Sequence, residues 1–315
     1  MKKYVMTNLI NKKILVTGGA GFIGSHLVDE LIKEKAKVFI IDNLSTGRKE
    51  NINPKAKFYK ADIRDFNKIE PFFKNIDFVF HLAAIPRVPL SVKDPVLTSQ
   101  VNILGTLNVF KAALDSKVKR IVFASSSAVY GNQKKLPLKE SMKPDPESPY
   151  GLQKLIGEQS ADLFTKIYGL PIISLRYFNI YGPRIDFSSD YSLVVGKFLN
   201  FSRQKKSLTI FGSGRQTRDF CYVKDAVLAA IKAAGSSKLK GGEVINIGSG
   251  ESYSINELSR LIGGERKYLP KRPGDTLHTK ADIYLAKKLL KWQPKTNLEE
   301  GLRETVSWFQ KNYKK

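Results

Sequence analysis

Short apolar runs alternate with amphipathic segments through the amino-terminal half of the chain. The runs lie at residues 14–16, 38–41, 58–59, 78–80, 121–123 and 172–175. Brief runs of this kind are typical of strands buried inside a sheet. Between the first two runs, Ile23, Leu27 and Leu31 recur at helical spacing, and residues 95–115 show a similar helical pattern. This alternation predicts right-handed crossovers and therefore an α/β fold with a doubly wound, Rossmann-like parallel sheet.

The regular alternation stops after Arg176, where Gly182 and Pro183 precede a polar stretch at residues 188–190. Residues 223–234 again have a helical pattern and residues 243–247 that of a strand, so we expect the chain to return to the first sheet. The predicted lobes are therefore interleaved. A large lobe comprises residues 11–178 and 219–250, and a smaller, carboxyl-terminal lobe comprises residues 179–218 and 251–315. Asn297, followed by Glu300, predicts the cap of a final helix.

The formal net charge of +24 raises nucleic acid or an anionic membrane as a partner. The lysines, however, are spread along the chain in singles and short pairs among acidic residues. Such mixing is typical of a solvated surface. We therefore predict neither a nucleic-acid nor a membrane partner, although the sequence alone leaves open whether the folded chain gathers these charges on one face.

The cysteine and histidine content argues against disulfides and structural metals. Cys221 is the single cysteine, and the three histidines, at 26, 81 and 278, have no metal-ligand spacing. No stretch reaches the roughly 18 apolar residues that crossing a bilayer requires, and polar residues interrupt the basic amino terminus before it could form the apolar core of a signal peptide. We therefore predict a cytoplasmic protein without a metal.

A glycine-rich turn follows the first predicted strand. Gly18, Gly21 and Gly24 form a GxxGxxG pattern that opens directly into the first predicted helix. Glycines let a backbone approach a pyrophosphate closely, and the amides of a helix start carry partial positive charge. With Asp42 at the end of the second predicted strand, in the position of a ribose-binding carboxylate, the pattern predicts a dinucleotide site.

The charge of Asp42 favours NAD over NADP. A carboxylate there accepts hydrogen bonds from the ribose hydroxyls and repels a 2′-phosphate. Arg48 could neutralise such a phosphate, but we expect it to face solvent. The predicted cofactor contacts around these two elements are Gly18, Gly21, Phe22, Ile23, Gly24, Asp42, Asn43, Ser45, Thr46 and Gly47.

Tyr150 and Lys154 are spaced so that they share one face of a helix. A phenol is a poor base at neutral pH unless nearby positive charge stabilises its phenolate, so we expect Lys154 and a cationic nicotinamide to lower the pKa of Tyr150. This spacing alone is common. Serines 125–127, at the end of a predicted strand, supply the context, because doubly wound sheets place their chemistry at strand ends. The pattern predicts Tyr150 as general base.

In these residues the chain resembles the extended short-chain dehydrogenase/reductase family, in particular the nucleotide-sugar 4-epimerases that act on UDP-glucose or UDP-N-acetylglucosamine. The resemblance implies a catalytic set of Ser126, Tyr150 and Lys154, in which Ser126 bonds the reacting sugar oxygen and Ser127 is its neighbour in the substrate pocket. It also implies NAD contacts from Asp62 and Ile63 at the adenine, from Leu82, Ala83 and Ala84, and from Asn102 and Phe178 at the nicotinamide half. Tyr150 and Lys154 are themselves predicted cofactor contacts, with Lys154 anchoring a ribose.

The same resemblance implies how the nucleotide sugar is bound and what happens to it. Asn179, Arg218 and Arg272 match residues that contact the diphosphate, and Asp275 matches one that bonds the nucleoside ribose. Similar dehydratases and decarboxylases carry an acidic residue just before Val-Tyr-Gly, where this chain has Ala128. The match therefore favours oxidation and re-reduction at C4 of a UDP-sugar over elimination.

Three features of the resemblance concern the sugar and the assembly. Thr279 matches the residue beside the sugar's C2 substituent, where a small side chain leaves room for an N-acetyl group as well as for plain glucose. Leu90 is a departure from the pattern, because several relatives that accept N-acetylated or acidic sugars carry arginine at this position. The family also suggests a homodimer through helices around residues 95–115 and 150–168. A dehydratase or reductase, or a non-catalytic RNA-binding protein of the same fold, are the alternatives.

Overall fold

The computed structural model describes residues 9–187, 192–271 and 277–313. Its centre is a parallel sheet of seven strands in the order β11-β6-β5-β4-β1-β2-β3. The strands are β1 (Lys13–Thr17), β2 (Lys37–Asp42), β3 (Lys57–Lys60), β4 (Phe78–His81), β5 (Arg120–Ser126), β6 (Ile172–Tyr177) and β11 (Val244–Ile247). Every predicted run is a strand of this sheet, and the return of residues 243–247 to it is confirmed.

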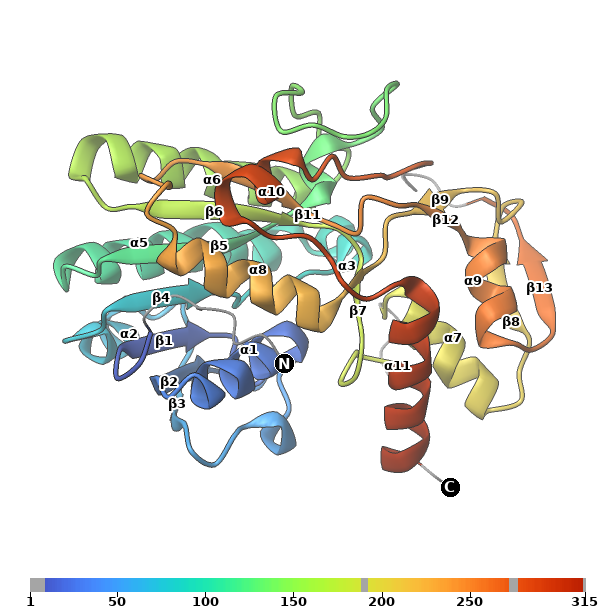
Figure 1. The fold of residues 1–315 in the computed structure, drawn as a ribbon, viewed down its shortest axis with the longest axis horizontal. Coiled ribbons are helices and arrows are strands. Elements are labelled where there is room, and N and C mark those ends of the chain that lie inside the picture. The colour runs from blue at the N-terminus through green and yellow to red at the C-terminus, as the bar shows by residue number, and fades with distance from the viewer. Residues whose placement is uncertain (1–8, 188–191, 272–276, 314–315) are drawn as a thin grey trace.

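Helices cover both faces of the sheet, as Figure 1 shows. One face packs against α1 (Phe22–Lys33) and α8 (Val223–Gly235), and the other against α5 (Gly105–Asp115) and α6 (Pro149–Tyr168). Short helices complete the large lobe: α2 (Phe66–Ile69), α3 (Val88–Lys93), α4 (Pro95–Ser99) and α10 (Tyr284–Leu290). Two apolar cores therefore enclose the sheet, and the predicted doubly wound fold is confirmed.

The helical segment predicted at residues 95–115 is not one regular α-helix. A π-helical turn at Gln100–Leu104 separates α4 from α5. Buried Asn102 lies in this turn and bonds both backbone groups of Ile85, at 2.8 and 3.1 Å. Apolar periodicity does not reveal such a turn, because the apolar positions of α5 beyond it still repeat at helical spacing.

The remaining elements lie beside the carboxyl ends of the strands. They are the strand pairs β7 (Ile180–Tyr181) with β10 (Cys221–Tyr222), β9 (Thr217–Arg218) with β12 (Tyr253–Ser254) and β8 (Leu208–Phe211) with β13 (Arg266–Leu269), and the helices α7 (Val194–Arg203), α9 (Ile255–Ile262) and α11 (Leu298–Asn312). Two of these pairs join the two sequence stretches that we assigned to the small lobe. Helix α10, assigned to the same lobe, instead packs against α8 and β11, so the exact lobe boundary stays a prediction.

Buried Asp219 fixes the segment between β9 and β10, where the chain returns from the predicted small lobe to the large one. Its carboxylate accepts hydrogen bonds from the backbone N–H groups of Ser249, Gly250 and Ala281, at 2.6, 3.0 and 2.9 Å. Burial raises the pKa of this carboxyl to about 6, although the hydrogen bonds oppose the shift. The segment beside Arg218 is thereby tied to two loops far away in sequence.

At the other end of this lobe, Asn297 caps α11 as predicted, accepting the N–H of Glu300 at 2.9 Å.

Candidate active site

One cavity of about 430 Å³ extends from the glycine turn after β1 across the carboxyl ends of the strands. It opens where the strand order reverses between β1 and β4, which is where doubly wound folds bind ligands. Most of the predicted cofactor residues line it: Gly18, Gly21, Phe22, Ile23, Gly24, Asp42, Asn43, Ser45, Thr46, Asp62, Ile63, Leu82, Ala83, Ala84, Tyr150 and Lys154. The fold thus gathers residues from five separate segments around one cavity.

The glycine turn has no room for side chains. A Cβ at Gly24 would lie 2.1 Å from the carbonyl oxygen of Gly18, and one at Gly18 would lie 2.7 Å from the amide nitrogen of Ala83. Gly18 also adopts a positive φ of 73°, which other residues rarely adopt. Helix α1 then starts without a side-chain cap. Its first amides therefore remain available for a phosphate, and the turn fits the pyrophosphate of a dinucleotide.

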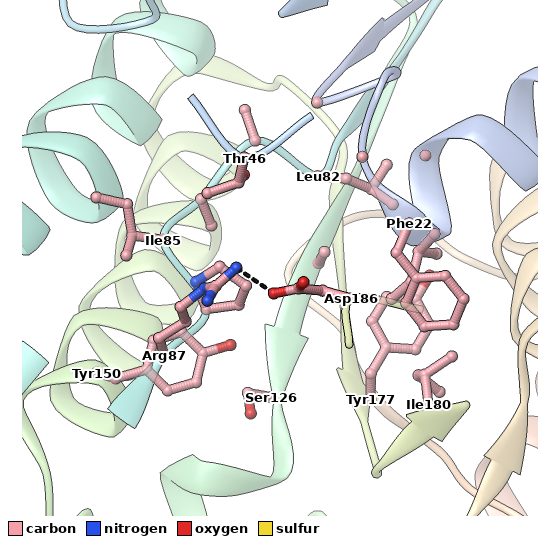
Figure 2. A pocket seen from close by; sticks show the side chains of 18 of the residues that line it. Phe22, Thr46, Leu82, Ile85, Arg87, Ser126, Tyr150, Tyr177, Ile180 and Asp186 are labelled. Carbon is pink, nitrogen blue, oxygen red and sulfur yellow. Dashed lines mark hydrogen bonds and ion pairs between the residues drawn. The ribbon is translucent and has the colours of Figure 1, made fainter. Parts of the chain in front are cut away.

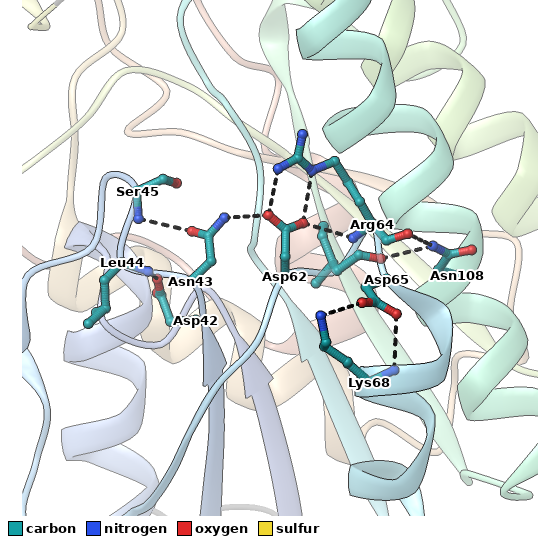
Figure 3. Close-up of polar contacts among 10 residues, drawn as sticks. Asp42, Asn43, Leu44, Ser45, Asp62, Arg64, Asp65, Lys68 and Asn108 are labelled. Atoms are coloured by element: carbon teal, nitrogen blue, oxygen red, sulfur yellow. Dashed lines mark hydrogen bonds and ion pairs between the residues drawn. The ribbon is translucent and has the colours of Figure 1, made fainter.

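A polar network shapes the wall at the end of β2 and β3 (Figure 3). Asp42 accepts the N–H groups of Ala20 and Leu44 at 3.0 and 2.8 Å, and Asn43 donates to Asp62 at 2.8 Å. Gly47 does not line the cavity but makes room for Asp42, since a Cβ there would lie 2.8 Å from the carboxylate. The structure thus holds the Asp42 carboxylate at the wall by backbone donors.

Asp62 and Arg48 are both engaged within the protein. Arg64 holds the carboxylate of Asp62 through two donors, and this lowers the pKa of Asp62 to about 2 (Figure 3). We expected Arg48 to face solvent, but in the structure it contacts other side chains. It donates to the Tyr313 hydroxyl at 2.8 Å and its guanidinium lies 5.3 Å from the Phe187 ring centroid. With Arg48 drawn toward these two aromatic residues, the negative charge of Asp42 dominates the ribose end of the site.

Ser126, Tyr150 and Lys154 line the same cavity from two elements, and Figure 2 shows Ser126 and Tyr150 in this pocket. Ser126 ends β5, while Tyr150 and Lys154 stand one turn apart near the start of α6. The start of α6 is fixed by Ser148, which accepts the N–H of Gly151 at 3.1 Å. The Ser126 hydroxyl accepts the N–H of Ala128 at 3.1 Å and is close enough to the Tyr150 hydroxyl to lower the pKa of the phenol. A sugar hydroxyl in the cavity could reach the serine and the phenol together.

The prediction for the Tyr150 pKa included bound nicotinamide, and the electrostatics of the protein alone run the other way. Burial raises the pKa of Tyr150 to about 12, and the nearby Ser126 hydroxyl only partly offsets this. The Lys154 ammonium donates to the carbonyl of Ala124 at 2.7 Å and lies 6.0 Å from the Tyr150 ring centroid. The predicted acidification of the phenol by Lys154 is therefore not present in the protein alone, because the desolvation of a buried phenolate outweighs a cation at that distance.

The pKa of Lys154 is also shifted, and a testable prediction follows from this shift. Burial lowers its pKa to about 7, while Glu158 one turn later opposes this. The unfolded chain, with a lysine pKa near 10.4, then binds more protons than the folded chain between these values. We expect the Lys154 contribution to the free energy of unfolding to increase as pH rises from 7 to 10, by at most about 1.4 kcal/mol per pH unit.

The measurement is the pH dependence of unfolding in urea for wild type and Lys154→Met. In Lys154→Met, the free energy of unfolding should no longer show this increase between pH 7 and 10. Lys166→Met is the control. It removes a lysine of the same helix that is 69% exposed and paired with Asp162, and it should show the same increase as wild type. Equal slopes in wild type and Lys154→Met would contradict the burial argument.

Two predicted contact residues lie behind the cavity wall. Asn102 is fully buried, and its amide bonds the Ile85 backbone and the side-chain carbonyl of Gln153, at 2.8 Å for the latter. Phe178 is also fully buried, with its N–H donating to Ile247 at 3.0 Å. Neither residue lines the cavity. Both residues lie one layer behind the cavity. Ile85, which Asn102 bonds, and Tyr177, which precedes Phe178, do line it.

Five of the predicted substrate residues reach the same cavity. Ser126, Ser127, Asn179, Arg218 and Thr279 all line it, whereas Arg272 and Asp275 lie outside the described residues. Asn179 donates to the carbonyl of Asp219 at 3.2 Å, and the Thr279 hydroxyl accepts the N–H of Asp219 at 3.2 Å. Asp219 thus fixes the residues around Arg218, a role that its isolated acidic side chain did not indicate.

This arrangement agrees with the matches to known proteins. A model of the NAD dependent epimerase/dehydratase family matches residues 14–248. The chain belongs to this family. Its NAD cofactor and its extended short-chain dehydrogenase/reductase fold, both expected from the sequence, are confirmed. The glycine turn, uncapped helix start and Asp42 carboxylate fit that cofactor.

Two solved relatives that match nearly the whole chain are UDP-sugar epimerases, and other relatives of similar coverage are named as UDP-sugar decarboxylases. A UDP-glucose 4-epimerase of Thermotoga maritima, solved with UDP-glucose, is 40% identical with a TM-score of 0.92, over 95% of this chain and 99% of that one. A UDP-N-acetylglucosamine 4-epimerase of Methanobrevibacter ruminantium, in complex with UDP-N-acetylmuramic acid, is 42% identical with a TM-score of 0.92, over 96% and 100%.

A third relative is named for an acidic sugar. The UDP-glucuronate 4-epimerase of Thermodesulfobacterium geofontis is 38% identical over 324 residues, covering 95% of this chain and 96% of the relative. The protein is thus an enzyme of the NAD-dependent nucleotide-sugar epimerase family. Its relatives differ in the sugar that they are named for. Across its described residues, no helix is both long and apolar enough to span a membrane.

Proposed function

We propose that the protein is a cytoplasmic 4-epimerase that interconverts UDP-glucose and UDP-galactose, and also their N-acetylated forms. The observation that carries this proposal is the convergence of Ser126, Tyr150 and Lys154 on the cavity that the glycine turn also lines. Ala128, where similar dehydratases and decarboxylases have an acid, leaves no extra carboxyl for elimination at that point. Asn179 and Arg218 would bind the diphosphate, because amide and guanidinium donors suit phosphate oxygens.

In this proposal the side chains handle one proton at the sugar's O4. Ser126 orients the O4 hydroxyl, and the Oη of Tyr150 takes its proton and later returns it. Bound NAD supplies a hydride acceptor and then donor for C4, so that the sugar passes through a 4-keto form and is reduced on its other face. Because burial raises the pKa of Tyr150 to about 12, its phenolate forms readily only when positive charge is close. Lys154, at the same wall, is the positioning partner of Tyr150.

The test of the reaction is incubation of purified protein with each UDP-sugar without added reductant. We expect interconversion of the two C4 epimers at equilibrium, with no net consumption of NAD. A keto or deoxy sugar accumulating as product would instead favour a dehydratase or reductase on this scaffold. RNA binding as the principal activity, unchanged in Tyr150→Phe, would overturn the catalytic proposal altogether.

Thr279 predicts acceptance of an N-acetyl group. It is small, 6% exposed and lines the cavity. Thr279→Tyr should lower kcat/KM for UDP-N-acetylglucosamine at least about tenfold relative to UDP-glucose, because overpacking a site costs about 1–3 kcal/mol. Thr279→Val is the matched control, since it loses the hydrogen bond from Asp219 but keeps the space. If valine shifts this ratio as much as tyrosine does, side-chain volume is not the cause.

The homodimer expected from the family has a candidate surface. Val92, Val96, Leu163 and Ile167 are 63, 67, 52 and 61% exposed on α3, α4 and α6. These helices contain or adjoin the two segments predicted for the interface. A second copy of this chain could bury this apolar face by a two-fold contact. Light scattering should give twice the mass of one chain, and Ile167→Glu should shift the mass toward one chain; a single-chain mass at all working concentrations would refute the dimer.

A further inference from the structure

An ion pair lies inside the cavity and joins its two sides. The Arg87 guanidinium donates to the Asp186 carboxylate at 2.6 Å, and both side chains line the cavity together with Tyr150 and Ser126. The side chains are 16 and 32% exposed. Figure 2 shows the pair in the pocket beside these catalytic candidates. Neither residue is assigned in the proposed reaction, so their charges need another explanation.

Both partners are held in place by their surroundings. Arg87 precedes α3, where its carbonyl accepts the N–H of Ser91 at 3.0 Å, and the Ser91 hydroxyl accepts the N–H of Tyr150 at 3.0 Å. Asp186 follows a segment anchored to α1 by the Arg184–Asp29 ion pair at 2.8 Å. The ion pair therefore connects the wall that carries Tyr150 with the segment after β7. Its position is set by packing rather than by two flexible surface chains.

A neutral pair of charges treats neutral and acidic sugars differently. Hydroxyl or amide groups of an uncharged sugar can bond either partner without separating them. A sugar carboxylate must either lie close to the Asp186 carboxylate or draw Arg87 away from it. Like charges this close are unfavourable, and separating a partly buried ion pair leaves charge without its partner.

We propose that the Arg87–Asp186 pair selects uncharged UDP-hexoses and N-acetylhexosamines over UDP-hexuronic acids. This inference rests on the proposed function and narrows its substrate class. Family membership alone does not decide the point, because the relatives include enzymes named for neutral and for acidic sugars. Asp186 neutralises the positive charge that Arg87 would otherwise offer to a substrate carboxylate.

The test compares kcat/KM for UDP-glucuronate with kcat/KM for UDP-glucose in one preparation of NAD-loaded enzyme. Asp186→Asn removes the competing carboxylate and should raise this ratio at least about tenfold. Arg87→Gln removes the attraction but leaves the repulsion, and should lower the ratio. The double variant restores a neutral pair and should return the ratio to near the wild-type value. Opposite signs in the two single variants exclude general damage as the cause.

Asp115→Asn is the matched control. It makes the same change in charge in an ion pair of the same length, 2.6 Å, with the Lys111 and Asp115 side chains 56 and 37% exposed, and Asp115 does not line the cavity. The ratio should stay at its wild-type value there. A change as large as in Asp186→Asn would mean that the effect comes from the protein's overall charge, and would overturn the inference.

Calorimetric binding of both UDP-sugars separates this inference from the reaction itself. If no UDP-sugar is epimerised but Asp186→Asn still shifts the ratio of the two affinities toward UDP-glucuronate, the proposed reaction fails and the charge selection stands. If wild type epimerises UDP-glucose but prefers UDP-glucuronate, or if Asp186→Asn leaves both ratios unchanged, the charge selection fails and the reaction stands.

Discussion

Tyr150→Phe is expected to lower kcat for UDP-sugar epimerisation by about 10²–10⁴-fold, the range that a positioned general base contributes. The substitution removes one oxygen and keeps the ring, which is 8% exposed and packed at the start of α6. Cofactor and substrate contacts elsewhere in the cavity are untouched. The loss should therefore appear in kcat, while calorimetric affinities for NAD and for the UDP-sugar stay within about threefold.

Tyr130→Phe is the matched control for this change. Its hydroxyl is also buried, donating to the side chain of Asn246 at 2.7 Å, but Tyr130 does not line the cavity. It should cost stability and leave kcat close to wild type. Epimerisation by Tyr150→Phe at a rate near that of wild type would show that another group moves the O4 proton.

The architecture was predictable because its signal is local. Buried parallel strands must be continuously apolar, so each sheet strand stood out as a short run, and the amphipathic stripe of α1 followed directly. The glycine turn was predictable for the same reason. Its backbone packs against the backbone of Ala83 and against its own first residue, Gly18, so only glycine fits at these positions. Where the backbone geometry dictates the residue type, the position can be predicted from one sequence.

Contacts between distant segments could not be predicted in this way. Arg87 and Asp186 come from loops on opposite sides of the cavity, and no periodicity connects them. The pKa of Tyr150 in the protein without bound nicotinamide could not be predicted for a related reason. Spacing brought Lys154 near the phenol, but the direction of the shift depends on how deeply both are buried. Burial is a property of the packed fold and could not be obtained from spacing alone.

A second contact of this kind supports the catalytic helix. Glu158, one turn beyond Lys154, receives two bonds from Arg176 of β6, at 2.9 and 2.7 Å, and one from Ser125. Both members of the ion pair are only 4% exposed, and the Arg176 guanidinium lies 4.5 Å from the Tyr130 ring centroid. The pair joins α6 to the sheet directly behind the strand end that carries Ser126. Removing one partner leaves a buried charge unpaired.

We therefore expect Glu158→Gln to lower the free energy of unfolding by about 3–5 kcal/mol, as for other buried pairs that lose one partner. Asp162→Asn, which breaks an exposed ion pair with Lys166 on the same helix, should cost no more than about 1 kcal/mol. Urea unfolding of the two variants measures the difference. The double variant Glu158→Leu with Arg176→Met should recover most of the loss, because an apolar pair carries no desolvated charge. If the double variant is as unstable as Glu158→Gln, the loss comes from packing around Ser125 and Tyr130 rather than from the unpaired guanidinium.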